Sequence, residues 1–591
     1  MSTDKGKAFD FKLLNRLFRY TSPYTFIFVL VAIAAILLSA FAVYRAVLVG
    51  NIVDEAIKMA DMDQLVFYVL LTLGVLLGEV VFQLIFNYFA NWLGQSVIRD
   101  IRVKLFKHMN SFKMSYFDNS SLGVLVTRAV ADMERIGEIF SNGFFMIIAD
   151  LLKMIVVAVI MVVLNWKLAL IVFAILPVLL YATRLFQRAM KTAFIEVRAQ
   201  VANLNSFVQE RIAGMKLVQL FNREKEESKT FNEINKLHRD AWIKTVWYNS
   251  LFFPVAEIVA STTTGLIVWY GGMNNLAGDQ VTDFGTIFTF ILLSEMLFRP
   301  LRQIADKFNT MQMGMVAAGR VFKILDSQFE VEPNGTVELH PVKGAIKFKD
   351  LHFGYIPEEE VLKGIDFEIK AGETVAIVGA TGAGKSTIIN LLNRFYKVDD
   401  GSIFIDGVDI NEFELNSLRS NIAVVLQDVF LFADTIQNNI SLKDDSISLE
   451  QIERAAMEIG VHNFFMKLPG GYGFNVKERG GMLSSGQRQL LAFLRAYVTK
   501  PSILILDEAT SSIDSYSEQL IQDATLKITK GRTSIVIAHR LATIQNADVI
   551  LVMDKGKIVE HGTHKELLQQ SGYYKKLYEA QFLEEADTET K

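Results

Sequence analysis

The chain of 591 residues contains no cysteine. This absence excludes disulfide bonds, zinc sites with cysteine ligands, iron–sulfur clusters and thiol catalysis. The sequence also lacks a large excess of charge of either sign, because 60 Lys and Arg stand against 64 Asp and Glu and give a formal net charge of −4. This near-balance argues against a general nucleic-acid-binding protein, so we expect no nucleic acid among its partners.

Charged residues make up only 21% of the chain and hydrophobic residues 51%, which is too apolar for an ordinary soluble enzyme or a disordered chain. A bilayer core of about 30 Å is crossed by about 20 mostly apolar residues in a helix. The first half of the chain has six such stretches, and no long apolar run follows residue 300. The predicted spans lie near 25–48, 65–93, 141–164, 168–186, 250–271 and 283–303.

The distribution of Lys and Arg predicts the orientation of these spans. The presumed external loops 44–64, 165–167 and 271–283 are acidic on balance, whereas the connections 98–140 and 184–250 are rich in Lys and Arg. Positive loops stay in the cytoplasm, so we expect a multi-pass protein of the cell membrane whose amino terminus is cytoplasmic. Residues 1–24 have the pattern of an amphipathic segment at the cytoplasmic membrane surface rather than of a cleaved signal peptide.

The two basic connections have few Pro or Gly and space their apolar residues three and four apart, which predicts helices that continue from the membrane into the cytosol. Each connection has one break, within 115–123 and within 211–222. The expected transmembrane domain covers 25–310, and a linker covers 311–339. We expect the tips of these helical extensions to contact another structure on the cytoplasmic side.

From about residue 340 short β-rich runs alternate with helices. The run at 374–378 leads into Gly379-Ala380-Thr381-Gly382-Ala383-Gly384-Lys385-Ser386-Thr387, and a helical stretch follows. This strand, glycine-rich turn and helix predict a phosphate-binding loop whose backbone N–H groups converge on phosphate oxygens. We expect Lys385 to reach the β- and γ-phosphates and Ser386 to ligate Mg²⁺, so the predicted cofactors are ATP and Mg²⁺.

A second apolar run, at 503–506, ends in Asp507 and Glu508. Such a run suits a central parallel strand whose carboxyl end faces the ligand. Asp507 then holds Mg²⁺ through water, and Glu508 orients the attacking water. The alternative is a pair of solvated loop acids.

Further short motifs resemble the ABC ATPases. The run Leu483-Ser484-Ser485-Gly486-Gln487 resembles their signature sequence, and Tyr355 resembles the aromatic residue that stacks on adenine. Gln427 resembles the Q-loop glutamine, Asp514 ends a segment like the D-loop, and His539 resembles the switch histidine. The break at 116–123 and the stretch 210–224 resemble the two coupling helices of exporters. Together these features identify the chain as similar to an exporter-type half-transporter of the bacterial lipid A flippase and multidrug group.

This resemblance implies a fold and a set of roles. The fold is a multi-domain membrane protein, with an all-α six-span domain followed by an α/β P-loop ATPase domain with a helical subdomain over 340–580, and a tail over 581–591. The implied catalytic residues are Glu508, His539, Lys385 and Gln427, and the implied metal-site residues are Ser386, Gln427 and Asp507. The implied nucleotide contacts are Tyr355, Gly379 through Thr387, Gln427, Ser484, Gly486, Gln487 and Asp514.

The resemblance also implies a dimer, because ATP in this family lies between the phosphate loop of one chain and the signature of the other. A homodimer is favoured and a heterodimer stays open. The signature has Ser485 where the family favours glycine, and we expect function with altered kinetics at the ATP site. The implied setting is a bacterial inner or plasma membrane, with the ATPase domain cytoplasmic and membrane lipids around the spans.

Four acids lie within the predicted spans: Glu79, Asp150, Glu257 and Glu295. Charges inside a membrane are costly and are suspected of function. One hypothesis is that these acids favour a small amphipathic cationic substrate or contact a lipid headgroup. The other is that they pair within the protein, for example Asp150 with Lys153 three residues on.

Three functional classes remain open. The leading hypothesis is an ATP-driven exporter or flippase of amphipathic lipids or drugs. The second is a peptide exporter, which the absence of an amino-terminal peptidase domain weakens. The third is an ATP-gated channel or regulatory membrane ATPase, against which Glu508 argues because it favours turnover.

Overall fold

The computed structural model describes residues 10–277, 283–329, 335–339, 342–356, 358–399, 401–508, 515–538, 541–570 and 572–579. The chain divides into two compact units. The first unit comprises Met1–Ser111 and Ser120–Gln328, and the second comprises Phe112–Asn119 and Phe329–Lys591. A short piece of the amino-terminal half therefore belongs to the second unit.

In its described part the first unit has six helical segments that are long and apolar enough to cross a membrane. This confirms the predicted all-α domain with six apolar spans. Three of the helices run for 48 residues or more, well beyond the roughly 20 that a bilayer needs. The helices that carry the apolar windows are α2 (Thr25–Asn51), α3 (Met62–Asn110), α7 (Phe145–Leu164), α8 (Trp166–Ala213), α10 (Glu224–Leu276) and α11 (Phe284–Leu325).

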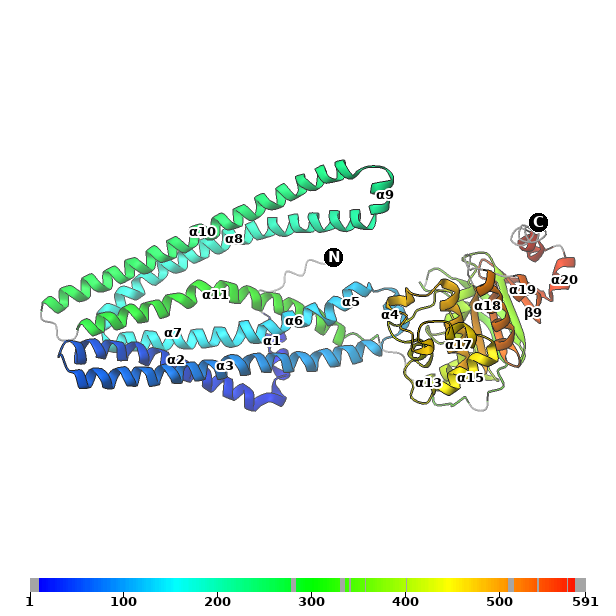
Figure 1. Ribbon diagram of the computed structural model, residues 1–591, viewed down its shortest axis with the longest axis horizontal. Coiled ribbons are helices and arrows are strands. Elements are labelled where there is room, and N and C mark those ends of the chain that lie inside the picture. Colours follow the sequence, from blue (N-terminus) through cyan, green and yellow to red (C-terminus); the bar gives the residue numbers. More distant parts are fainter. Residues whose placement is uncertain are drawn as a thin grey trace. The chain divides into compact units, whose positions relative to one another are not determined.

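Helices α8 and α10 lie side by side over most of their length and are joined by the short helix α9 (Met215–Leu220), as Figure 1 shows. We call α8, α9 and α10 the arm. The remaining long helices α2, α3, α7 and α11 pack on one another. At one end of this group α2 and α11 approach closely, because a Cβ atom on Gly285 would fall on the carbonyl oxygen of Gly50. Asp54 secures the contact by accepting a 2.8 Å hydrogen bond from the backbone N–H of Gly285.

The second unit is built on two sheets. The larger has the strand order β10-β9-β3-β8-β7-β6, and its strands are parallel except for the β9–β10 pair. The smaller, β2-β1-β4-β5, is antiparallel. The strands of the larger sheet are β3 (Thr374–Gly379), β6 (Ile422–Val425), β7 (Ile503–Glu508), β8 (Thr533–Ala538), β9 (Val549–Asp554) and β10 (Lys557–Gly562); those of the smaller are β1 (Ile346–Phe353), β2 (Leu362–Ile369), β4 (Ile403–Ile405) and β5 (Val408–Asp409).

Burial on both faces makes β3, β7 and β8 the centre of the large sheet. In β3, Val375 and Ile377 enter one core together with the smaller sheet and α12 (Lys385–Leu392). Ala376 and Val378 enter a second core under helices that include α15 (Leu449–Ile459) and α17 (Ser485–Val498). A near-continuous apolar run is the expected sequence of a strand covered on both sides. The predicted α/β P-loop domain with a helical part is confirmed.

The register of the central strands positions the functional residues. Ile377 of β3 and Asp507 of β7 both pair with Ile537 of the intervening strand β8. The loop that follows β3 and the carboxylates that end β7 therefore emerge at the same edge of the sheet. This is the edge where ligands bind in open α/β sheets.

Candidate nucleotide site and membrane charges

The glycines of the loop between β3 and α12 allow the backbone its tight turn. Gly382 and Gly384 have φ values of 83° and 100°, which side chains disfavour, and Gly384 is the N-cap of α12. A Cβ atom on Gly384 would also lie 2.7 Å from the Leu362 side chain. The predicted strand, turn and helix are present, so backbone N–H groups and the positive end of α12 meet at this loop.

Lys385 opens α12 and folds back over the loop. Its Nζ atom donates hydrogen bonds to the carbonyl oxygens of Gly379 at 2.8 Å and Ala380 at 3.0 Å. Burial lowers the pKa of the Lys385 ammonium below its ordinary value, and the negative charge of Asp507 partly opposes this shift. The ammonium is thus a buried positive charge at the mouth of the loop, where a phosphate oxygen can replace a carbonyl as its acceptor.

Asp507 lies next to the two residues that follow the loop. Burial raises the pKa of its carboxyl, whereas the charge of Lys385 and a hydrogen bond from the Ser386 hydroxyl lower it. The negative charge of Asp428, the neighbour of Gln427, raises it further. The structure therefore brings Lys385, Ser386 and Asp507 together, with the segment after β6 within electrostatic reach.

These donors fit a magnesium ion that is bound with a phosphate. The Ser386 hydroxyl and the Asp507 carboxylate are adjacent oxygen ligands, the type that Mg²⁺ prefers. Among the described residues no cluster of three or more His, Cys, Asp or Glu can hold a metal alone. The remaining ligands of such an ion would then come from the side chain predicted at Gln427, from water and from a nucleotide, as is usual for Mg²⁺.

The structure places the other predicted catalytic positions in part. Glu508 is the last residue of β7, and its backbone pairs with Ala538, the last residue of β8. The next residue in the chain, His539, lies outside the described residues, as does Asp514 and the side chain of Glu508. Gln427 is exposed just after β6.

Tyr355 is connected directly to the phosphate loop. Its hydroxyl donates to Thr387 Oγ1 at 3.2 Å and accepts from Asn390 Nδ2 at 3.0 Å. The ring of Tyr396 meets the Tyr355 ring edge to face, with 5.0 Å between centroids. Tyr355 remains exposed, so part of its surface is available to a ligand.

Ser484 and Gln487 lie on another element, the start of α17. They form a capping box in which the Ser484 hydroxyl accepts from the Gln487 N–H and the Gln487 side chain accepts from the Ser484 N–H. Ser485 is the first helical residue and has no positive φ, a conformation that serine adopts without strain. The departure from the family sequence at Ser485 therefore leaves the backbone of this segment intact.

The four acids of the predicted spans have different surroundings. Glu79 Oε2 accepts from Arg45 Nε at 2.8 Å, and its side chain is only 16% exposed. Asp150 pairs with Lys307 of α11. Its partner is therefore on another helix, and Lys153 instead lies within electrostatic reach of both Glu79 and Asp150.

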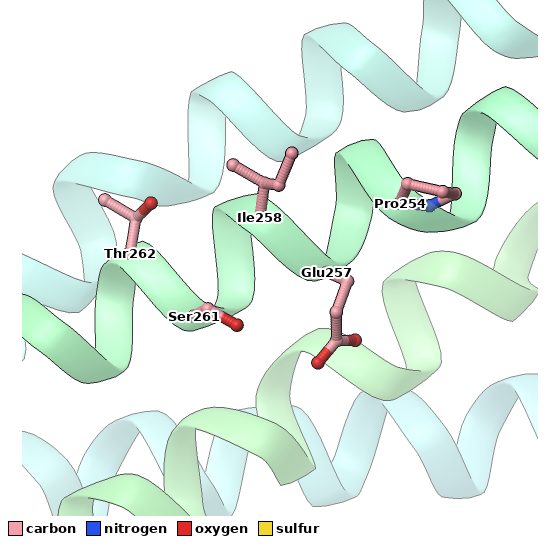
Figure 2. A pocket seen from close by; sticks show the side chains of 5 residues that line it. All are labelled: Pro254, Glu257, Ile258, Ser261 and Thr262. Atoms are coloured by element: carbon pink, nitrogen blue, oxygen red, sulfur yellow. The ribbon is translucent and has the colours of Figure 1, made fainter.

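Glu257 is open to a ligand. It lies 3.5 Å from Arg302, yet its side chain remains 70% exposed. With Pro254, Ile258, Ser261 and Thr262 it lines an open hollow of about 540 Å³ on α10. Figure 2 shows the Glu257 carboxylate pointing away from α10, toward α11. Glu295 of α11 is also exposed.

Sequence reasoning missed the residues that support these groups. Asn390 and Tyr396, which contact Tyr355, follow the phosphate loop closely in the sequence. An aromatic residue just after the helix that follows this loop was the signal that could have indicated Tyr396. Sequence reasoning also missed the basic partners of the acids, which are Arg45, Lys307 and Arg302. They lie in or near the predicted spans, so a search of the spans for basic residues would have found them.

Known proteins share both parts of this arrangement. The family model for the ABC transporter transmembrane region matches residues 26–301, and the model described as ABC transporter matches residues 362–511. An ATP-dependent lipid A-core flippase of Haemophilus influenzae is 37% identical over 539 residues, which cover 90% of this chain and 91% of that protein. The chain belongs to the ABC transporter family.

Other ABC transporter relatives agree along most of the length. The lipid A-core flippase of Desulfotalea psychrophila is 35% identical over 96% of this chain and 99% of its own. The Bacillus subtilis protein named "Probable multidrug resistance ABC transporter ATP-binding/permease protein YheH" is 36% identical over 85% of this chain and 76% of its own. The predicted exporter-type half-transporter is confirmed. This ABC transporter is a multi-pass membrane protein that couples ATP hydrolysis to export.

We predict that Lys385→Ala weakens ATP binding roughly 10- to 100-fold, since a charge-assisted hydrogen bond contributes about 1.5–3 kcal/mol. Titration with a fluorescent ATP analogue measures the change. Lys347→Ala, which removes an exposed lysine that pairs with Glu368, is the control and should bind the analogue normally. Unchanged affinity in Lys385→Ala would contradict the assignment of the phosphate loop.

Proposed function

We propose that two copies of this half-transporter form a head-to-tail dimer that exports or flips an amphipathic lipid or drug-like molecule across the cell membrane. The observation that carries the proposal is the contact of Lys385, Ser386 and Asp507 at the carboxyl edge of the central strands. In this proposal the backbone of residues 379–387 cradles the phosphates of ATP. Tyr355 stacks on the adenine.

The hydrolytic step depends on the residues that end β7 and β8. Ser386, Asp507 and Gln427 would hold Mg²⁺ together with the phosphates, and the ion would supply positive charge at the phosphate oxygens. Glu508 polarises the attacking water and His539 contacts the γ-phosphate. The backbone pairing of Glu508 with Ala538 supports this, because Ala538 is the residue that precedes His539 in the chain.

The exposed start of α17 supports the proposed dimer. The hydroxyl of Ser484 faces solvent and is free to donate, because the capping box uses it only as an acceptor. With Gly486, Gln487 and Asp514 it completes the ATP site of the opposite chain. ATP then bridges the two ATPase domains and favours their association by binding the closed state.

The arm supports the same assembly. Its tip exposes large apolar side chains, including Leu217 at 61%, Leu220 at 68% and Phe221 at 67%. Apolar groups gathered at the end of a projecting hairpin mark a surface that a protein partner covers. We assign that partner to the ATPase domain of the second chain. A homodimer is favoured because one chain supplies both Glu508 and the signature residues.

The substrate path lies along α10 and α11. Glu257, Ser261 and Thr262 give the hollow a polar lining between apolar residues, which suits a molecule with a polar head and an apolar body. Glu79 and Asp150 are occupied by basic partners, so Glu257 and Glu295 are the acids assigned to substrate. The amino terminus and the ATPase domain are assigned to the cytoplasm of a bacterial inner or plasma membrane.

We predict that Glu508→Gln binds ATP normally but hydrolyses it about 10²- to 10⁴-fold more slowly, the range for loss of a general base. Phosphate release and ATP-driven substrate movement in sealed vesicles are the two measurements. Glu450→Gln, an exposed glutamate in the first turn of α15, is the control. Phosphate release at the parent rate in Glu508→Gln would refute the catalytic role.

The chain offers a matched pair for the dimer. Ser484 and Ser448 form equivalent capping boxes, each with a glutamine three residues on. We expect Ser484→Ala and Ser448→Ala to lower stability equally, by about 1 kcal/mol. Only Ser484→Ala should reduce ATPase activity, by about tenfold, through a lost hydrogen bond to phosphate. Equal ATPase rates in the two variants would count against the shared site.

Neutralising the two open acids tests the substrate role. Transport of a cationic dye into sealed vesicles should fall several-fold in Glu257→Gln/Glu295→Gln, because the change removes two carboxylates that attract the positive charge of the dye. The control is Glu196→Gln, which loses an exposed carboxylate paired with Lys244 between α8 and α10. Dye transport at the parent rate would discard the role of these acids.

A further inference from the structure

Tyr396 lies four residues after the end of α12 and is part of the aromatic cluster around Tyr355. Its ring is 5.0 Å from the Tyr355 ring, at 84°, and 5.8 Å from the Phe353 ring, at 69°. Tyr355 is also fixed from its hydroxyl end by Thr387 and Asn390. The orientation of the Tyr355 ring is thus set jointly by the phosphate-loop helix and by Tyr396.

The hydroxyl of Tyr396 points to a different segment, helix α4 (Met114–Asp118), where it donates a hydrogen bond to the Asp118 carboxylate. Helix α4 belongs to the second unit, while the residues before 112 and after 119 belong to the first. Figure 1 shows α4 beside the strands and helices of the second unit. The chain of the first unit therefore passes through the second at this short helix before it returns to the first.

The rest of α4 is held on another side by Phe329, which follows α11. Tyr116 packs on Phe112 and Phe329, with ring centroids 4.6 and 4.9 Å away. The backbone N–H of Lys113 donates to the Phe329 carbonyl at 2.8 Å. Apolar packing anchors α4, and the Asp118 bond is its polar contact with the residues around Tyr355.

The Tyr396 hydroxyl is suited to remain a donor. Burial and the Asp118 carboxylate raise its pKa above the ordinary value for tyrosine. A protonated phenol and an exposed carboxylate form a charge-assisted hydrogen bond, which is stronger and more directional than one between neutral groups. Movement at either end is therefore passed to the other.

We propose that Tyr396 is a positioning residue that couples adenine binding at Tyr355 to the position of α4, through its hydrogen bond to Asp118. The inference rests on the proposed role of Tyr355 in the nucleotide site. Adenine that stacks on Tyr355 fixes the ring, the fixed ring holds Tyr396, and the Tyr396 hydroxyl holds Asp118. By linkage, a change in the position of α4 alters ATP affinity by the same factor.

The absence of cysteine makes α4 directly observable. Lys113→Cys places one thiol on the exposed N-cap of α4, where an environment-sensitive fluorophore can be attached to the full-length protein in nanodiscs. In this labelled parent, ATP should shift the emission. Adding Tyr396→Phe, which keeps the ring and removes the hydroxyl, should reduce the shift at least twofold while ATP affinity changes less than threefold.

Two further variants separate coupling from packing. Asp118→Asn should reproduce the effect of Tyr396→Phe, and the double variant should show no additional loss. Tyr396→Leu, which also removes the ring, should in addition raise the KM for ATP several-fold. Tyr497→Phe is the control, because it removes a tyrosine–carboxylate bond to Glu458 elsewhere in the same unit and should leave the shift unchanged.

The outcomes distinguish this inference from the proposed function. If a fluorescent ATP analogue fails to bind the labelled parent, the proposed nucleotide site is wrong. If the analogue binds and ATP shifts the emission equally in Tyr396→Phe and the parent, the site stands and the coupling role of Tyr396 is overturned. An additive loss in the double variant with Asp118→Asn would overturn it as well.

Discussion

The register of three parallel strands supports every functional feature of the second unit. Because β3, β7 and β8 are covered on both faces, alternate residues of each strand belong to different cores, and a slip of one residue would exchange the two sets. The register therefore has one solution. That solution places the loop after β3 and the acids that end β7 at one edge, where Lys385 and Ser386 reach Asp507.

The membrane unit is constrained instead by the charged groups that lie in its apolar environment. A lone carboxylate between apolar helices is costly, and Glu79 and Asp150 avoid the cost by pairing with Arg45 and Lys307. Each pair joins two helices, so each also fixes how those helices pack. Glu257 differs from Glu79 and Asp150, because most of its side chain stays exposed although it has Arg302 as a partner.

Much of this organisation was predictable because it is local in sequence. An apolar span is a single run of residues, and the phosphate loop is a continuous segment between a strand and a helix, so both could be recognised without knowledge of distant contacts. Pairings between helices were not predictable in this way. Asp150 has a basic residue three positions away, and only the packing of α7 on α11 decides that it pairs with Lys307 instead. The contact between Asp118 and Tyr396 spans 278 residues and left no trace in local patterns.

The place of α4 in the second unit has a consequence for how the protein is made. Its hydrogen-bond partner Tyr396 is synthesised 278 residues after Asp118. At a translation rate of about 5–20 residues per second, α4 waits on the order of tens of seconds before its binding surface exists. For most of that time Phe112 and Tyr116 lack Phe329, which both of their rings contact in the folded unit. The membrane helices on either side of α4 can therefore be inserted before α4 docks on the ATPase domain.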